Sequence, residues 1–339
     1  MNLFELTRAL VDIESVTNHE QNVADFLFTH LSALAAHHHG RVERLAVEAK
    51  RDNIFAAFGE PTVTFSTHMD TVPPFFASRE DHEWIHGRGA CDAKGIIAAM
   101  IAAVEKLLLS GTRNLGLLFV AGEERNSAGA KAAARTPRGS KFLVNGEPTE
   151  NHLALGCKGG LRFEITAHGK LAHSAYPELG HSAIHVLLDV LSDIRRIPLA
   201  HDELLGAATL NVGVISGGRA PNVVADHAQA EIMFRTVGDP EVMRARVQAA
   251  CAGRAEGLEV LHTPAIRLAP LDGLPTTVVA FTTDIPTFEG LWGQPFLIGP
   301  GSIHVAHTAE ERVAKTQLTE AVEIYARMAR QLLERGAAA

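Results

Sequence analysis

The sequence predicts an α/β protein of two domains, in which a smaller α+β domain is inserted into a larger domain with a mixed sheet. Apolar runs alternate with amphipathic stretches over residues 1–156, which is typical of an α/β layer sheet. Residues 157–268 follow the order β-α-β-β-α-β of a ferredoxin-like unit. The length of 339 residues suits two domains of ordinary size.

The larger domain is expected over residues 1–156 and again over residues 269–339. An N-terminal helix places Leu3, Leu6 and Leu10 on one stripe, and Thr17-x-x-Glu20 has the form of a capping box that opens a second helix. The other elements predicted for this domain are strands at 41–47, 53–58, 62–67, 115–121, 141–145 and 295–298, and helices at 94–110 and 315–333.

The inserted domain is expected over residues 157–268. One predicted strand alternates Ala228, Ala230, Ile232 and Phe234 with polar residues, so its sheet has one buried face. The elements predicted for this domain are strands at 160–169, 207–215, 228–236 and 257–262, and helices at 181–197 and 240–255.

The composition argues against several classes of protein. A net charge of −8 without any Lys/Arg run speaks against a nucleic-acid surface. Cys91, Cys157 and Cys251 are too few and too scattered for a disulfide framework or a thiolate zinc site. No apolar stretch approaches about 18 residues, and the N-terminus has the pattern of a helix, not of a signal peptide. We therefore expect a cytoplasmic protein without a membrane span.

Side chains that bind metal ions follow apolar runs at several places. Ligands bind beyond the carboxyl ends of strands in α/β sheets, so these side chains are expected to share one site. Each alone has an ordinary explanation, such as a chance His-x-Asp, a helix cap or an acidic loop. Together they predict a hydrolytic site with two metal ions. The residues are His68 with Asp70, Asp92, Glu123 with Glu124, Glu147 and, more than 150 residues later, His307.

The chemistry of these residue types suits a pair of divalent ions. His68-x-Asp70 suits a metal ligand with the residue that orients it. Glu123 and Glu124 are adjacent carboxylates that repel each other, so one is protonated or both face cations. One glutamate then binds metal while the other takes a proton from water. Zinc is the first expectation for the ions, with cobalt or manganese as alternatives.

These motifs resemble, in order and spacing, the M20 family of zinc aminoacylases and peptidases, which includes acetylornithine deacetylase and succinyl-diaminopimelate desuccinylase. The resemblance runs from about residue 5 to residue 330. It implies a mixed-sheet zinc-peptidase catalytic domain with an inserted ferredoxin-like lid. The motifs that carry it are His68-Met69-Asp70-Thr71, Gly89-x-x-Asp92-x-Lys94-Gly95, Glu123-Glu124, Gly146-Glu147-Pro148-Thr149 and Ala306-His307.

The resemblance implies a role for each motif. Asp92 would bridge two metal ions, His68 and Glu147 would complete one ion's ligands, and Glu124 and His307 those of the other. Glu123 would act as general base and then general acid, and Asp70 would orient His68. His304 also lies near the C-terminal motif, but the ligand in the family is the histidine of the Ala-His pair, hence His307.

The resemblance also implies substrate contacts. His173 would polarise the scissile carbonyl, often from the partner subunit of a dimer, and Asn222 and Arg235 would hold the substrate's carboxylate end. A salt bridge on an edge strand is an alternative role for Arg235. Gly301 would let the substrate approach the backbone closely. Arg125, directly after the glutamate pair, departs from the small residue usual in the family.

The expected function is metal-dependent hydrolysis of the amide bond of a small N-acyl amino acid, as by an acetylornithine deacetylase in amino-acid metabolism. A di- or tripeptidase of the same family is the nearest alternative. A non-catalytic metal-binding protein on this fold is an alternative of a different class. We also expect a homodimer that forms through the lid domain.

Overall fold

The computed structural model describes residues 1–338, which form two compact units. Unit 1 comprises Met1–Leu155, Leu268–Thr277 and the chain from Thr283 onward, and unit 2 comprises Gly156–Arg267 and Val278–Thr282. The predicted fold class is confirmed, with a mixed sheet in unit 1 and an antiparallel sheet in unit 2. The division falls beside the expected domain boundaries, except that Val278–Thr282 joins unit 2.

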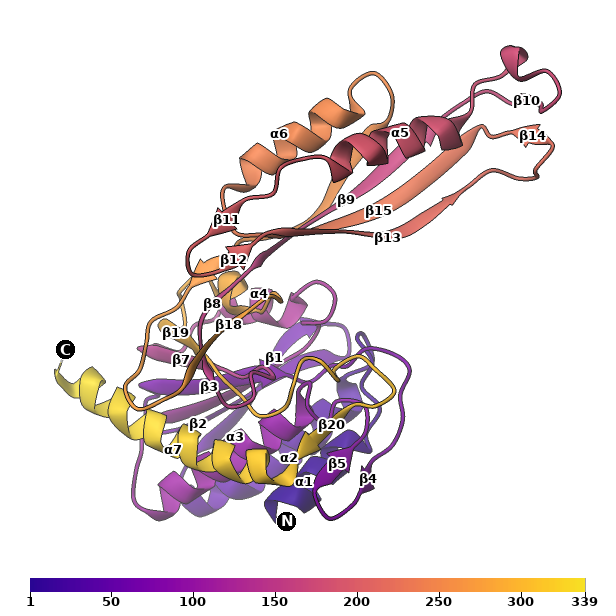
Figure 1. The fold of residues 1–339 in the computed structure, drawn as a ribbon. Coiled ribbons are helices and arrows are strands. Elements are labelled where there is room, and N and C mark those ends of the chain that lie inside the picture. The colour runs from indigo at the N-terminus through magenta and orange to yellow at the C-terminus, as the bar shows by residue number, and fades with distance from the viewer. Residues whose placement is uncertain (339) are drawn as a thin grey trace. The chain divides into compact units, whose positions relative to one another are not determined.

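Unit 1 is built on a six-stranded sheet in the order β1-β2-β6-β3-β7-β19 (Figure 1). The first two strands and β6 pair antiparallel, whereas β6, β3, β7 and β19 run parallel to one another. The carboxyl ends of four neighbouring strands therefore lie along one edge. The strands are β1 (Arg41–Glu48), β2 (Arg51–Phe58), β3 (Val63–His68), β6 (Leu115–Val120), β7 (Phe142–Asn145) and β19 (Gln294–Leu297).

Both faces of this sheet are covered, which explains the continuous apolar runs of its strands. Ile54 and Phe58 belong to a large core on one face of the sheet. Phe55 packs with Trp292 in a smaller core on the other face. The large core is formed with α1 (Leu3–Val11), α2 (Gln21–His38), α3 (Lys94–Leu109) and α7 (Lys315–Ala338), and the smaller one with α4 (Ala128–Ala134) and η2 (Ile285–Phe288). No helix within residues 1–338 has the length and apolarity needed to cross a membrane.

The predicted capping box at the start of the second helix is wrong. Helix α2 begins at Gln21 after Glu20, and no side chain caps it. Thr17 and Glu20 instead bond to residues that are far away in the sequence, Asp70 and Arg51. The local pattern was misleading because these long-range partners satisfy both side chains.

Unit 2 has the ferredoxin-like order expected for the inserted domain. Its four strands pair antiparallel as β13-β15-β9-β16, and α5 and α6 contribute to a core on one face of the sheet. The alternation predicted on the third strand is present, because Ala228, Ala230, Ile232 and Phe234 are all buried. The elements are β9 (Gly159–His168), α5 (Ala183–Arg195), β13 (Thr209–Gly217), β15 (His227–Thr236), α6 (Pro240–Cys251) and β16 (Glu256–Thr263).

Short elements complete both units. Unit 1 also contains β4 (Arg79–Glu80), β5 (Trp84–His86) and β20 (Arg312–Ala314), which form a small sheet. Unit 2 also contains β10 (Ala172–His173), η1 (Pro177–Leu179), β11 (His201–Asp202), β12 (Gly206–Ala207), β14 (Val223–Val224) and β17 (Ile266–Arg267). The chain passes between the units along β8 (Leu153–Cys157) and β18 (Thr276–Val279).

Candidate metal centre

Three of the ligand segments leave the sheet side by side. His68 is the last residue of β3, which lies between β6 and β7. In the register, His68 pairs with Val120 of β6, and Ser66 pairs with Asn145 of β7. The segments that carry Glu123-Glu124 and Glu147 follow directly and therefore flank His68, as the sequence predicts.

Asp92 occupies the centre of the cluster. It lies in the loop before α3, and its side chain is 6% exposed. Nε2 of His68 is 2.9 Å from its Oδ1, and Nε2 of His307 is 3.3 Å from its Oδ2. Each oxygen of this carboxylate faces a different histidine, which is the arrangement needed to bridge two ions.

Glu124 and His307 contact each other beside Oδ2 of Asp92. Nε2 of His307 lies 3.0 Å from Oε1 of Glu124. Hydrogen bonds to Asp92 and Glu124 raise the pKa of His307 to about 10. Donor atoms of His68, Asp92 and Glu124 all lie within 4.8 Å of one another. A single cation can therefore be reached by ligands from three separate chain segments.

Two further carboxylates lie at the site, Glu147 buried and Glu123 half-buried. Burial raises the pKa of Glu123, and the neighbouring Glu147 raises it further. Burial also raises the pKa of Glu147 well above its usual range. Oε1 of Glu147 is buried and has no hydrogen-bond partner within residues 1–338. Carboxylates that are removed from water and close together repel one another unless a nearby positive charge compensates them.

The residues fit a pair of divalent ions. Imidazole nitrogens and carboxylate oxygens are the ligands that zinc takes in hydrolytic sites. Bound ions would supply the missing positive charge and use the unsatisfied oxygen of Glu147. The predicted division of ligands between the two ions, with His68 and Glu147 on one and Glu124 and His307 on the other, stays a prediction.

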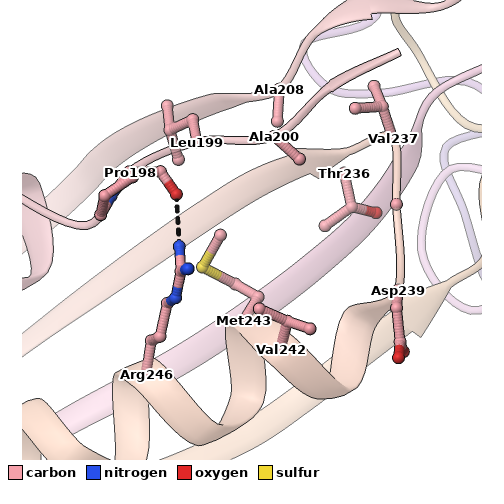
Figure 2. A pocket seen from close by; sticks show the side chains of 11 residues that line it. Pro198, Leu199, Ala200, Ala208, Thr236, Val237, Asp239, Val242, Met243 and Arg246 are labelled. Carbon is pink, nitrogen blue, oxygen red and sulfur yellow. Dashed lines mark hydrogen bonds between the residues drawn. The ribbon is translucent and has the colours of Figure 1, made fainter.

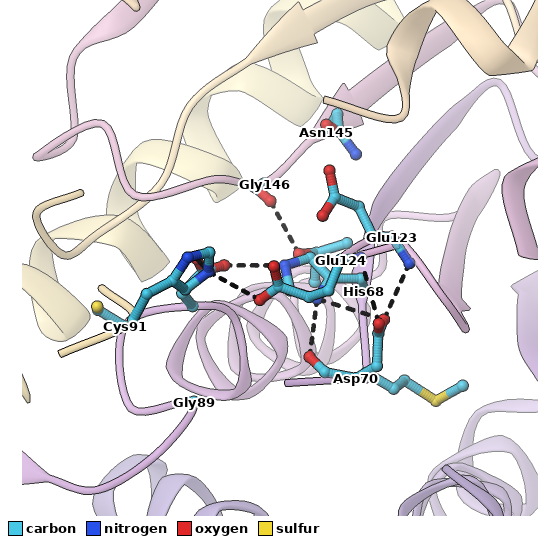
Figure 3. Close-up of polar contacts among 12 residues, drawn as sticks. His68, Asp70, Gly89, Cys91, Glu123, Glu124, Asn145 and Gly146 are labelled. Carbon is cyan, nitrogen blue, oxygen red and sulfur yellow. Dashed lines mark hydrogen bonds and ion pairs between the residues drawn. The ribbon is translucent and has the colours of Figure 1, made fainter. Parts of the chain in front are cut away.

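Asp70 holds the segment that carries the two glutamates (Figure 3). Its Oδ1 accepts hydrogen bonds from the N–H groups of Gly122, at 2.9 Å, and Glu123, at 3.1 Å. Its Oδ2 accepts one from the N–H of Glu124, at 3.2 Å. Nδ1 of His68 lies 2.9 Å from the main-chain oxygen of Asp70 and 3.6 Å from its Oδ1. Asp70 thus positions the predicted base and two predicted ligands, although it contacts His68 mainly through its backbone.

Thr17, Glu20 and Arg51 support this segment, a role that the sequence did not indicate for any of them. Thr17 donates its hydroxyl to Oδ2 of Asp70 at 2.7 Å. Arg51 forms two hydrogen bonds to the buried Glu20, at 2.7 and 2.9 Å. Arg51 also lies against Gly122, where a Cβ would come within 2.7 Å of its Nη2 and where φ is +82°. Only long-range contacts reveal these roles, so no local pattern signalled them.

Asp284 is another buried acid that the sequence did not single out. It is 1% exposed at the start of η2, and neither carboxylate oxygen has a hydrogen bond of ordinary geometry within residues 1–338. Burial raises its pKa to about 6, against the opposing influence of the Ser127 hydroxyl. Its charge in turn contributes to the raised pKa values of Glu123 and Glu147.

Other predicted residues of unit 1 have specific environments. Gly301 has a φ of +93°, and a Cβ there would lie 2.5 Å from that of Cys91, so internal packing already requires glycine. Arg125 is exposed beside the glutamate pair. The N–H of His304 donates to the hydroxyl of Ser302, whereas the side chain of His307 contacts two acidic residues.

The predicted lid residues belong to unit 2. His173 and Asn222 are neighbours, because His173 pairs with Val223 and the N–H of Ser174 bonds to the Asn222 carbonyl. Arg235 lies on β15, opposite Gly160 of β9. Unit 2 also has a cavity of about 260 Å³ with Pro198, Met243 and Arg246 in its lining (Figure 2). None of the predicted catalytic or ligand residues lines it.

Comparisons with known proteins identify the family of this chain. The sequence matches the profile described as Peptidase family M20/M25/M40 over residues 64–331. A Peptidase M20 domain-containing protein of Schizosaccharomyces pombe is 38% identical over 96% of this chain and 84% of the relative. A probable carboxypeptidase of Aspergillus flavus is 35% identical over 96% of this chain and 89% of the relative.

Solved structures share the fold at lower identity. An M20 family metallo-carboxypeptidase from Sulfolobus solfataricus has a TM-score of 0.80 at 17% identity, over 98% of this chain and 99% of that chain. A tripeptidase from Staphylococcus aureus has a TM-score of 0.80 at 21% identity, over 97% and 98%. With the profile match and the relatives above, the chain belongs to peptidase family M20/M25/M40 and is a hydrolase of peptide or amide bonds.

Proposed function

We propose that the protein is a metal-dependent peptidase that removes the C-terminal residue of small peptides. The observation that carries this proposal is the name carboxypeptidase borne by relatives that are 35–37% identical along nearly the whole chain. The metal centre supports it, because hydrolysis of a peptide bond and of an N-acyl bond requires the same ligands and base. Deacylation of an N-acetyl amino acid is the second candidate, favoured by the deacetylase-like segment from Gly299 to His307.

The chain's own residues have distinct tasks in this proposal. When bound, two divalent ions would acidify a water molecule and polarise the scissile carbonyl. Glu123 accepts the proton of that water and returns it to the leaving amine. Asp70 keeps Glu123 and Glu124 in place through their backbone N–H groups. Arg235 suits the free carboxylate of the substrate, because its guanidinium forms two parallel hydrogen bonds to a carboxylate.

We also propose that the working form is a dimer. His173 follows the end of β9, where His168 pairs with His227, whereas Arg235 pairs with Gly160 near the start of that strand. Eight residues of strand separate these positions, which corresponds to about 26 Å. A small substrate cannot span that distance, so His173 and Arg235 of one chain cannot both contact it. A partner chain that supplies His173 removes this conflict.

The test is product analysis of the protein loaded with zinc, cobalt or manganese. Substrates are N-blocked dipeptides, the same dipeptides as C-terminal amides, free dipeptides and N-acetyl amino acids. A carboxypeptidase releases the C-terminal residue from the N-blocked peptides and leaves the amides intact. A strong preference for an N-acetyl amino acid would replace this proposal by the deacylase.

The base is tested by Glu123→Gln. Because Gln cannot take a proton, turnover should fall by about 10²–10⁴-fold while the protein still binds its metal. The matched control is Glu105→Gln, an exposed residue on α3, which should have normal turnover. Metal content by elemental analysis and kcat on the best substrate are measured together. Normal kcat in Glu123→Gln would contradict the assignment.

A further inference from the structure

A buried carboxylate joins two loops that carry proposed metal ligands. Glu311 is 1% exposed and lies four residues after His307. It directly precedes β20, whose Arg312 pairs with His86 at the end of β5. The loop from Gly87 to Asp92 leaves β5 at that same point. Both ligand loops thus meet at one end of a short two-stranded ladder, with Glu311 between them.

The contacts of Glu311 are with the Asp92 loop. Its Oε1 accepts hydrogen bonds from the N–H of Gly89 at 2.8 Å and from the N–H of Asp92 itself at 3.3 Å. Its Oε2 is paired with the guanidinium of Arg88, which is 2% exposed. Its main-chain oxygen accepts the N–H of Gly87 at 3.1 Å. One residue of the His307 segment therefore fixes the backbone of the loop that ends at Asp92.

His307 needs such an anchor more than the other ligands do. Its side chain is 48% exposed, whereas those of Asp92 and Glu124 are 6% and 7% exposed. It lies outside regular secondary structure with a φ of +64°. Packing therefore does little to fix His307, and the nearest firm attachment that follows it in the chain is Glu311.

We propose that Glu311 is a positioning residue of the metal centre, which sets the distance between Asp92 and His307 through its bonds to the Asp92 loop. This inference rests on the two-ion site proposed above but not on any substrate. It predicts that loss of these bonds weakens the binding of the ion shared by Asp92, Glu124 and His307. Residues that orient ligands typically change metal affinity by about 10–100-fold.

The alternative is that Glu311 and Arg88 form an ion pair that serves the fold alone. Replacing a buried ion pair by apolar residues of similar volume is often neutral for stability. The double variant Arg88→Met/Glu311→Met therefore separates the two roles, because it removes the anchor without leaving an unpaired buried charge. Glu311→Asp is a second variant, which keeps a counter-charge for Arg88 but draws the carboxylate back from the two N–H groups.

The experiment is a titration of each metal-free protein with Co²⁺, followed by visible absorption and by competition with a chromophoric chelator. We expect one of the two ions to bind about 10–100-fold more weakly to both variants, with a changed cobalt spectrum. Urea denaturation checks that each variant is folded. The control Glu43→Met/Arg138→Met removes a pair from the surface of the same unit and should change nothing.

The outcomes distinguish this inference from the two-ion site. Normal affinity and spectrum in folded Arg88→Met/Glu311→Met or Glu311→Asp would overturn the role of Glu311 and leave the metal centre standing. A wild-type protein that binds no Co²⁺ would overturn the metal centre and this inference together. Equal weakening of metal binding in the Glu43/Arg138 control would show a general effect of stability and would also overturn the inference.

Discussion

Two buried acidic side chains near this site, Asp70 and Glu311, accept hydrogen bonds from the backbone of the segments that carry predicted ligands. The carboxylate of Asp70 accepts the N–H groups of Gly122, Glu123 and Glu124, and Glu311 does the same for Gly89 and Asp92. Backbone donors bound to a charged acceptor form strong hydrogen bonds in a buried place. The ligands are thus set by the course of the chain rather than by their rotamers alone.

Asp70→Asn tests this at the residue scale. An amide has one acceptor oxygen and one NH₂ group, so at least one backbone N–H would meet another donor. We expect a loss of about 10–100-fold in metal affinity or kcat, with the protein still folded. Thr17→Val removes one hydrogen bond to the same carboxylate and should cause a smaller loss. Equal kinetics in Asp70→Asn and the wild type would argue against this role.

Asp284→Asn tests the cost of a buried acid. Because its folded pKa of about 6 lies above the usual value of 3.8, Asp284 loses stabilising free energy as the pH rises through that range. Without metal, Asp284→Asn should equal the wild type below about pH 4 and exceed it above about pH 6. The gain in the free energy of unfolding is up to about 3 kcal/mol. Urea denaturation between pH 4 and 7.5 measures this gain. A gain in the free energy of unfolding that becomes larger at lower pH would contradict the prediction.

At the scale of elements, periodicity predicted the strands and helices well, because each apolar face meets the core that it implies. The strand over 62–67 is β3 (Val63–His68), and the helix over 94–110 is α3 (Lys94–Leu109). The predicted ligands His68, Glu124 and Glu147 could be grouped from sequence because they lie at or just after the ends of neighbouring strands. The roles of Thr17, Arg51 and Glu311 could not be predicted, because their partners are distant in sequence. The same holds for Asp284, whose burial results from the fold and not from any local pattern.

We predict that the proposed dimer forms through the edge strand β13 of unit 2. This strand lies at the edge of the unit 2 sheet, and Val214 and Ile215 are 51% and 54% exposed on it. Unpaired strand edges with apolar side chains associate unless a partner covers them. Val214→Lys should convert the proposed dimer to a monomer, as measured by light scattering after size exclusion, with the unfolding transition unchanged. A wild-type protein of monomeric mass would contradict the dimer.

For the whole molecule, ion binding should affect the two units differently. All the proposed ligands belong to unit 1, so bound metal stabilises only the folded form of that unit. At a free metal concentration of about 100 times Kd, the gain is about 2.7 kcal/mol. Calorimetry with zinc and with chelator should show one unfolding transition that moves and one that does not. A shift of both transitions by equal amounts would show that the units unfold together.

The order of the elements along the chain also bears on synthesis. Unit 2 is complete at Thr282, before β19, His307 and α7 have been made. A growing chain can therefore fold the inserted unit first, since domains tend to fold as they emerge from the ribosome. Unit 1 must wait with an uncovered sheet edge and an incomplete set of ligands, because His307 follows Glu147 by more than 150 residues. The ion that His307 would help to bind can therefore have its full set of ligands only late in biogenesis, when the chain is nearly finished.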